Sequence, residues 1–338
     1  MVSLHVEMAP VLDFNNYTVA WIAPLQIEAQ AAIRMLDKIH DGNFRSDPGD
    51  DYKYIGGEIN GHNVVVATLP PGTQYGGASA AALAAQVKKC FKKLWFGLLV
   101  GIAAGLPDLS RDPPLDIRLG DVLVSVPDSE NTGVVQYDFG KQKAEGFENR
   151  SRQAVTASIV RAAFGQIQSL AGIQGNTFLK NLKKIEDVRN DDGKLLFKYP
   201  GQEMDHLYET VNKKDRLVQR DRREEKSRTR VWYGNIGSGN ILMKSSRERD
   251  QLRDKYKIIG LEMEIAGTMN TIPVGHIRGV CDYADMHKKK DWQGYAAAVA
   301  AAYAREVLCI INPPEEQRGQ FQSFYISVGF FISDSESR

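Results

Sequence analysis

The fold class is decided by Gly72-Thr-Gln-Tyr-Gly-Gly77 together with the two segments that follow it, Ala78–Phe91 and Leu94-Trp-Phe-Gly-Leu-Leu-Val100. Residues 78–91 are rich in alanine, with apolar side chains at helical spacing, and 94–100 is a continuous apolar run that suits a buried strand. A glycine-rich turn, a helix and a buried strand in this order are typical of an α/β sheet.

The same alternation continues on both sides of this stretch, so we expect one large α/β domain. Short β-rich runs are separated by helical segments, some rich in alanine and one long and amphipathic. The expected strands are 17–23, 52–59, 64–68, 94–100, 121–125, 134–139, 231–236, 258–263 and 275–280, and the expected helices are 30–36, 78–91, 153–170 and 292–308.

Three stretches lie outside this pattern. We expect residues 1–16 to form an N-terminal extension and the α/β domain to cover 17–312. Residues 180–230 are highly charged with few apolar positions, which predicts an insertion on the surface. The tail, 313–338, has aromatic residues between 321 and 331 and then a Ser- and acid-rich end, which is typical of a partly disordered segment.

The composition excludes several function classes. With 43 Lys+Arg against 42 Asp+Glu, the chain has no overall basic field for nucleic acid. Cys90, Cys281 and Cys309 are far apart, without the paired spacing of a disulfide framework or a zinc site. Residues 1–16 do not have the basic stretch followed by an apolar stretch that is typical of a signal peptide, and no apolar run is long enough to span a membrane. We therefore expect a cytoplasmic protein with no metal and no cofactor.

Ligands of open α/β sheets bind beyond the carboxyl ends of strands, so the residues after each apolar run are the candidates for a site. Four such segments stand out. They are Ala23-Pro-Leu-Gln-Ile-Glu28, Gly101-Ile-Ala-Ala-Gly105, Leu261-Glu-Met-Glu264 and Cys281-Asp-Tyr-Ala-Asp285. Each has a plain structural explanation when it is taken alone, because glycines serve tight turns and Glu28 can stabilise a helix N-terminus.

The carboxylates carry more information than the glycines. Glu262 and Glu264 are two apart on a strand end, so both side chains point the same way. Asp282 follows a strongly apolar strand, where a buried carboxylate is costly unless it has partners or a task. Asp282 is therefore the most informative single residue.

Taken in chain order, these segments resemble the superfamily of purine nucleoside phosphorylases, uridine phosphorylases and methylthioadenosine nucleosidases, over about 17–308. The most specific matches are Gly-x-x-x-Gly-Leu at 101–106, Leu-Gly-Asp-Val-Leu-Val at 119–124, Glu-Met-Glu at 262–264 and the aspartate after Ile-Arg-Gly-Val-Cys. The similarity is closer still to a fungal branch found in NLR-like immune-receptor proteins, on Val280-Cys-Asp-Tyr-Ala-Asp285 and Asp291-Trp-Gln-Gly-Tyr-Ala-Ala297. The resemblance implies a three-layer α/β/α fold with a central mixed, partly barrel-like sheet.

The resemblance also implies roles for the carboxylates in breaking a purine N-glycosidic bond. Asp282 would be the general acid that protonates or hydrogen-bonds the purine N7, which requires a raised carboxyl pKa. Glu264 would hold the ribose hydroxyls, with Glu262 and Met263 lining the sugar pocket. Glu28 would accept a proton from the attacking water.

The remaining candidates for substrate binding come from the loops. Gly77, Gly101 and Ala103 belong to the glycine-rich segments, and the base would pack near Asn240. In many relatives an aromatic ring fills that place. The segment Ser238-Gly-Asn-Ile241 lacks one, so Phe139 or Tyr137 would supply the ring from another loop.

The nucleophile decides between hydrolysis and phosphorolysis. Phosphorylases of the superfamily commonly place an arginine after the first strand, whereas this chain has Gln26 and Glu28 there and no Arg or Lys before Arg34. A carboxylate would repel phosphate but could activate water, so hydrolysis is favoured. Phosphorolysis stays open, because an arginine could enter from elsewhere in the fold.

The substrate is expected to be a purine nucleoside or nucleotide. Relatives acting in immunity are thought to deplete ATP by removing adenine, which favours adenosine or ATP here. Lys180, Lys183, Lys184 or some of Arg220–Arg230 would then bind phosphates, unless the insertion is only a solvated loop. A nucleoside-sensing domain without turnover is a further alternative. The resemblance also implies a homo-oligomer, and we expect neither nucleic acid nor membrane as a partner.

Overall fold

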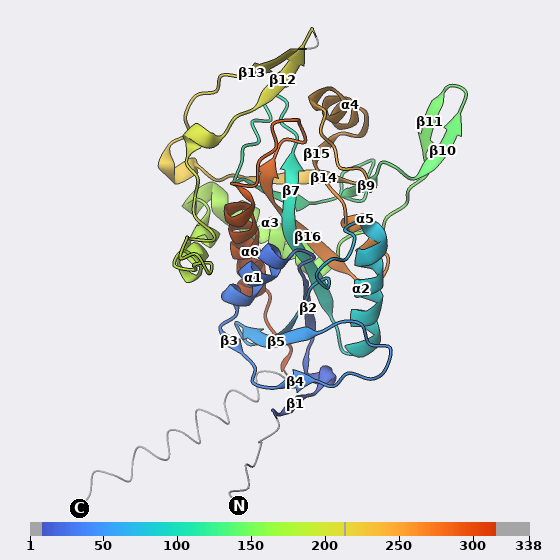
Figure 1. Ribbon diagram of the computed structural model, residues 1–338, viewed down its shortest axis with the longest axis vertical. Helices are drawn as coiled ribbons and strands as arrows, with labels where there is room; N and C mark the ends of the chain where they lie inside the picture. Colours follow the sequence, from blue (N-terminus) through green and yellow to red (C-terminus); the bar gives the residue numbers. More distant parts are fainter. Residues whose placement is uncertain (1–8, 213, 316–338) are drawn as a thin grey trace, which may run out of the picture.

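The computed structural model describes residues 9–212 and 214–315, so the aromatic part of the tail lies outside the described residues. One ten-stranded sheet forms the centre of the molecule (Figure 1). Its strands are β2 (Val19–Ile22), β3 (Lys38–Ile39), β5 (Tyr54–Ile59), β6 (His62–Ala67), β7 (Phe96–Gly105), β8 (Val122–Ser125), β9 (Val134–Gln136), β14 (Val231–Ser238), β15 (Ile258–Glu262) and β16 (Val274–Asp282).

The sheet is mixed and partly closed on itself. Its strand order is β15-β14-β8-β16-β7-β2-β6-β5-β3, with β9 paired to β14. The end of β7 also pairs with β15, because Ala104 and Gly105 lie opposite Leu261 and Gly260 in antiparallel register. β7, β15, β14, β8 and β16 therefore form a five-stranded barrel, which confirms the expected architecture.

Helices cover both sides of this sheet, as Figure 1 shows, with α1, α3 and α6 on one side and α2 and α5 on the other. Their bounds are α1 (Gln26–Met35), α2 (Gly77–Cys90), α3 (Ser158–Gln174), α4 (Ser246–Tyr256), α5 (Ile265–Thr268) and α6 (Gln293–Ile310). α6 is buried along most of its length. It is rich in alanine because it packs closely on β16, where a side chain at Gly279 would collide with the backbone of Ala296.

The predicted elements agree with the structure in type and differ at their ends. The strand expected at 94–100 runs on through Gly101–Gly105 in β7, because this glycine-rich segment keeps its ladder with β16. The helix expected from 153 begins at Ser158. The helix α4 was not expected from the charged sequence, although Ser245 accepts a hydrogen bond from the Glu248 amide as an N-cap.

Three small pairs of strands lie outside the main sheet. They are β1 (Val11–Leu12) with β4 (Asn43–Phe44), β10 (Gly140–Lys143) with β11 (Gly146–Asn149), and β12 (Tyr208–Val211) with β13 (Lys214–Leu217). Figure 1 shows the β10–β11 hairpin projecting from the body and the β12–β13 hairpin at the end of the molecule that also bears α4. The 3-10 helices are η1 (Phe14–Asn16), η2 (Thr177–Lys184), η3 (Gln202–Met204) and η4 (Glu225–Ser227).

The charged segment 180–230 is anchored more firmly than its sequence predicts. Asn181 of η2 is buried against α6, as is Phe178 just before the segment. Arg223 is also buried and forms a bidentate pair with Asp121, at 2.6 and 3.0 Å. This part of the insertion is therefore not the solvated loop that its charge indicated.

No helix within residues 9–212 and 214–315 combines the length and the apolar character needed to cross a bilayer.

Candidate active site

A cavity of about 670 Å³ lies where several strand ends meet. We call it the main cavity. The ends of β7, β15 and β16 and the start of α1 supply its walls. The lining residues are Leu25, Gln26, Ile27, Glu28, Gln30, Tyr75, Ile102, Ala103, Ala104, Tyr137, Ile241, Leu242, Met243, Leu261, Glu262, Met263, Glu264, Cys281, Asp282, Ala284, Lys288, Lys290 and Gln293.

A buried cluster of charges forms one side of the main cavity. The guanidinium of Arg278 lies 2.5 Å from a carboxylate oxygen of Glu262, 3.4 Å from Glu264 and 3.8 Å from Glu28. The Arg278 side chain is wholly buried. Burial alone would lower the pKa of Arg278, but the three carboxylates raise it. Three acidic groups therefore share a single buried cation.

Glu28 stands in the first turn of α1, where its side chain caps the N-terminus of the helix. Its two carboxylate oxygens accept hydrogen bonds from the backbone amides of Leu25, at 2.8 Å, and Ile102, at 2.7 Å. Burial raises the pKa of Glu28 to about 7, although Arg278 and both amides favour the charged form. A carboxyl group that titrates near neutral pH is suited to general base catalysis.

Glu262 and Glu264 both reach Arg278, although only Glu262 lies on the strand and Glu264 stands at the start of α5, and they have different backbone partners. Glu262 accepts the backbone amides of Glu264 and Ile265, so it fixes the start of α5 as well as Arg278. Burial and the neighbouring Glu262 raise the pKa of Glu264 to about 8 against the effect of Arg278. Glu264 therefore has the freer carboxyl group.

Gly101 is required by this charge cluster. In the ladder between β7 and β16 it lies opposite Arg278. A side chain at this position would collide with the Glu28 carboxylate and the Arg278 guanidinium. The glycine thus lets the acidic side chain and the cation pack directly on the strand.

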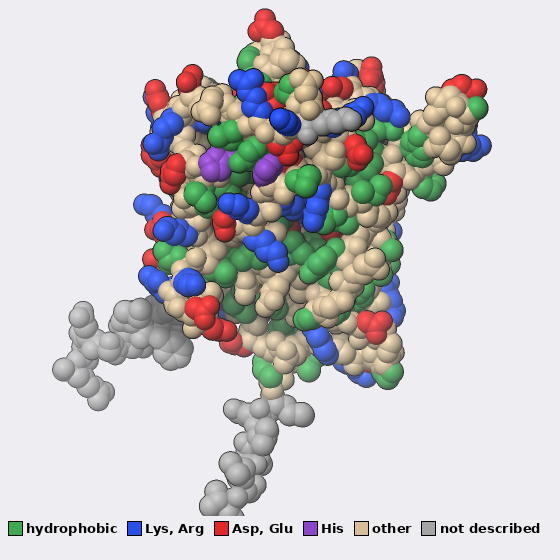
Figure 2. Space-filling model, turned by 45° about the horizontal axis from the view of Figure 1, so that its top comes forward, with side chains coloured by type: hydrophobic (Ala, Val, Ile, Leu, Met, Phe, Trp, Pro, Cys, Tyr) green, Lys and Arg blue, Asp and Glu red, His purple; other side chains and the backbone are tan. Residues whose placement is uncertain are grey.

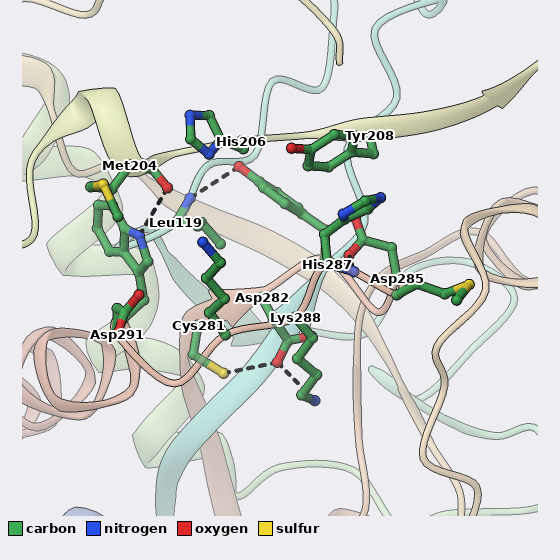
Figure 3. A pocket seen from close by; sticks show the side chains of 14 residues that line it. Leu119, Met204, His206, Tyr208, Cys281, Asp282, Asp285, His287, Lys288 and Asp291 are labelled. Carbon is green, nitrogen blue, oxygen red and sulfur yellow. Dashed lines mark hydrogen bonds and ion pairs between the residues drawn. The ribbon is translucent and has the colours of Figure 1, made fainter. Parts of the chain in front are cut away.

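Asp282 ends β16 and lines the main cavity, and its carboxylate has three partners. One oxygen accepts the Ala284 amide at 2.9 Å, and the other accepts the Cys281 thiol at 3.2 Å and lies 2.8 Å from the Lys288 ammonium. The chain turns back sharply at Ala284, whose φ is 53° in the left-handed region. Lys288 lies beside Asp282 after this turn, as Figure 3 shows.

Arg278 and Lys288 are the two site residues that the sequence reading missed. The signal for Arg278 was a lone cation within an apolar strand, inside the quoted Ile-Arg-Gly-Val-Cys motif. The signal for Lys288 was weaker, since it is the first of three lysines in a polar turn. Burial lowers the pKa of Lys288, but Asp282 has the opposite effect and the net shift is upward.

A second cavity, of about 380 Å³, adjoins the main cavity and shares Cys281, Asp282 and Lys288 with it. We call it the side cavity. The charged insertion supplies Met204, His206 and Tyr208 to its wall. Figure 3 shows these residues facing the turn that follows β16, and Figure 2 shows acidic, basic and histidine side chains intermixed on this face.

The side cavity is held together by an arginine from the insertion. Arg220 pairs with Asp205 at 2.9 Å and donates to the Tyr283 hydroxyl, also at 2.9 Å. The same hydroxyl donates to Asp205 and accepts the Leu119 amide. Since Tyr283 follows Asp282 in the chain, the insertion buttresses the segment that carries Asp282.

The loop residues that were expected to bind substrate do not all line the same cavity. Ala103 and Met263 line the main cavity. Gly77 and Asn240 line a smaller cavity of about 210 Å³ that shares Met263 with it. Phe139 is 57% exposed and stands outside the main cavity, whereas the ring of Tyr137 is buried and lines it.

The lysines of the insertion that were expected to bind phosphate do not line the main cavity. Lys180 is 3.5 Å from Glu306 of α6, and Lys184 is 3.0 Å from Asp37. Among the lysines, Lys288 and Lys290 line the main cavity instead.

No family model matches the chain. Its sequence is 39% identical over 331 residues to a nucleotide-binding leucine-rich repeat (NLR)-like protein of Hyaloscypha variabilis. The match covers 95% of this chain, which spans only 32% of the length of that relative.

Solved structures share the architecture at low sequence identity. The 5′-methylthioadenosine/S-adenosylhomocysteine nucleosidase of Neisseria meningitidis, in complex with methylthio-immucillin-A, superposes with a TM-score of 0.56 at 18% identity over 87% of this chain and 99% of that chain. The futalosine hydrolase of Helicobacter pylori gives 0.57 at 14% identity over 87% and 98%. The chain therefore has the fold of the nucleoside phosphorylase and nucleosidase superfamily that its motifs predicted.

Proposed function

We propose that the chain is a purine N-ribosyl hydrolase, which cleaves the N-glycosidic bond of a purine nucleoside or nucleotide to free base and ribose moiety. The observation that carries the proposal is one cavity lined by Glu28, Glu264 and Asp282, each supplied by a different strand end or helix start. Breaking this bond needs a base for water, a group for the ribose and a group for the leaving purine. The three carboxylates match these three needs.

Each carboxylate has an environment that suits its role. Glu28 is held by two backbone amides and titrates near pH 7, so it can take a proton from water. Glu264 has a carboxyl group that can accept the ribose hydroxyls, and with a pKa raised to about 8 it becomes the negative charge that would stabilise an oxocarbenium-like ribose as pH rises through that value. Asp282 lies on the leaving-group side, where it and Lys288 would meet the purine.

The charge around Glu28 supports hydrolysis rather than phosphorolysis. An arginine does enter from elsewhere in the fold, as Arg278 of β16, but it already faces three carboxylates. Phosphate would have to displace one of these carboxylates and stay beside the others, which electrostatic repulsion opposes. Water, being neutral, meets no such barrier.

Adenosine or ATP is the favoured substrate within this proposal. The similar structures include a nucleosidase for methylthioadenosine in complex with a purine analogue. The fungal relative is NLR-like, and resemblance to relatives in immunity favours ATP. Lys288 and Lys290 are cations of the main cavity that could meet the phosphates of a nucleotide.

The test is release of free base from adenosine, guanosine, inosine and ATP, each with and without phosphate, resolved by chromatography. We expect base release without phosphate, together with free ribose or ribose triphosphate. Strict dependence on phosphate, with ribose 1-phosphate as product, would show a phosphorylase instead. Binding without any base release would show a nucleoside-sensing domain.

A further inference from the structure

The position of the Asp282 carboxylate depends on a backbone conformation that is costly to hold. One carboxylate oxygen accepts the Ala284 amide at 2.9 Å, and Ala284 has a φ of 53°, in the left-handed region that residues other than glycine rarely adopt. Such a conformation persists only where the surrounding structure over-determines it. Tyr283, which lies between these two residues, makes contacts that hold the turn.

Tyr283 is fixed at its backbone and at the far end of its side chain. Its carbonyl accepts a hydrogen bond from the guanidinium of Arg249 in α4, at 3.0 Å. Its buried hydroxyl accepts from the Arg220 guanidinium at 2.9 Å and from the Leu119 amide at 3.2 Å, and it donates to the Asp205 carboxylate at 2.5 Å. Both lone pairs and the proton of this hydroxyl are therefore engaged, which fixes the position of the ring.

Arg220 is the cation that the charged insertion contributes to this set of contacts. Its side chain is only 6% exposed, and it pairs with Asp205 at 2.9 Å and with Asp116 at 3.4 Å. It also donates to the Ile117 carbonyl at 3.2 Å. A guanidinium has five N–H donors in a fixed plane, so one side chain can hold several groups at once. Arg220 thus ties the insertion to Tyr283 and to the segment that precedes β8.

We propose that Arg220 is a positioning residue for the reaction, which acts through Tyr283 on Asp282. This inference rests on the proposed function, in which Asp282 meets the leaving purine. The guanidinium fixes the Tyr283 hydroxyl, the fixed tyrosine maintains the turn at Ala284, and the turn keeps the Asp282 carboxylate in place. None of the described residues between 180 and 230 lines the main cavity, so the insertion serves catalysis without touching the substrate there.

The experiment measures kcat and KM for R220M, R220K and Y283F, with the purine substrate that the wild type cleaves. Methionine removes the guanidinium, lysine keeps a cation with fewer donors, and phenylalanine removes only the hydroxyl. R222M is the matched control, because Arg222 is exposed. R220M and Y283F are also combined with D282N, in which the residue that they are proposed to act on has lost its carboxylate.

We expect kcat to fall about 10- to 100-fold in R220M and Y283F with little change in KM, because displacing a reacting group by about 1 Å has an effect of this size. R220K should lose less, and R222M should match the wild type. D282N itself lowers kcat, and adding R220M or Y283F to it should lower kcat no further, because residues that act through one group are not additive. A purely structural role would give the same loss in both backgrounds.

Wild-type kcat in R220M and Y283F would overturn the inference. A loss of equal size in the D282N background would also overturn it, because the two residues would then support the pocket as a whole rather than Asp282. If R220M does not fold, Y283F decides alone, since removal of one hydroxyl leaves the pair of Arg220 and Asp205 in place.

Failure of the proposed function has a different signature. A wild-type chain that releases no base from any purine substrate refutes the hydrolase itself. An active wild type whose variants keep kcat, or lose it equally in both backgrounds, refutes only the role given to Arg220.

Discussion

Glu28 has two backbone partners and a pKa near neutral pH, so its replacement is the sharpest test of the water-activating role. We predict that E28Q lowers kcat about 10²- to 10⁴-fold, since glutamine keeps the shape but cannot take a proton. In the wild type, activity should rise with pH through about 7 as Glu28 ionises, and E28Q should lose this acid limb. Base release measured from pH 5 to 9 checks both effects.

Binding is the control for this variant. A purine nucleoside analogue should bind E28Q about as tightly as it binds the wild type, because Glu28 would act on water and not on the base. An E28Q enzyme with wild-type kcat would show that water is activated by another group.

The two glutamates with raised pKa values also predict how stability depends on pH. Burial raises the pKa of Glu28 from 4.5 to about 7 and that of Glu264 from 4.5 to about 8. Between pH 4.5 and 8 the folded chain therefore binds more protons than the unfolded chain. The free energy of unfolding from these groups must then fall as pH rises through this window.

The variant E264Q should flatten that dependence, because glutamine stays neutral at every pH. Urea denaturation at pH 5, 6, 7 and 8 would measure it, with E145Q on the exposed β10–β11 turn as a control that keeps the wild-type slope. An E264Q slope equal to that of the wild type would contradict the raised pKa of Glu264.

At the scale of elements, the sequence predicted which residues stand at the strand ends. It did not predict which side chains pair with them. The rule that α/β ligands gather at strand ends correctly brought Glu28, Glu264 and Asp282 to one cavity. Glu262 and Glu264 both contact Arg278, but alternation along a strand is not the reason, because β15 ends at Glu262 and the backbone of Glu264 is helical. The pairing of Lys288 with Asp282 depends on a left-handed turn at Ala284, a conformation that alanine rarely adopts. No local sequence signal predicts such a turn.

The insertion shows the same limit of prediction from local sequence. Its charge pattern predicts a solvated surface. Local sequence cannot show that Arg223 pairs with Asp121, which is 102 residues away in the chain. The closure of the barrel by β15 and β7 is equally non-local. Element types follow from periodicity within a segment, whereas these contacts depend on packing between distant segments.

We predict that R223M destabilises the chain by about 3–5 kcal/mol, because it leaves Asp121 charged and unpaired in the interior. Asp121 is wholly buried, and its carboxylate also accepts the Trp232 indole and the Arg230 amide. The free energy of unfolding in urea measures the loss. The neighbouring R222M is the control, since Arg222 is exposed. Equal stability of R223M and R222M would show that the buried pair contributes nothing.

At the scale of the whole molecule, the mouth of the main cavity exposes an apolar rim. Tyr75, Ile241 and Leu242 line the cavity and are each more than half exposed, at 54%, 57% and 54%. Apolar side chains gathered at a cavity mouth are typical of a surface that another molecule covers. Resemblance to the superfamily implies that the covering molecule is a second copy of this chain, which would complete the pocket.

We therefore predict a homo-oligomer that forms through this rim. The variant L242E should shift the mass measured by light scattering towards the monomer and raise KM, because the charge opposes burial of the rim and opens the pocket. Ile173 on α3 is 83% exposed and makes the matched control, so I173E should keep both the mass and KM of the wild type. If L242E keeps the oligomer while KM rises, the rim serves the substrate alone and the copies meet elsewhere. A wild-type monomer with full activity would instead mean that one chain closes its own pocket.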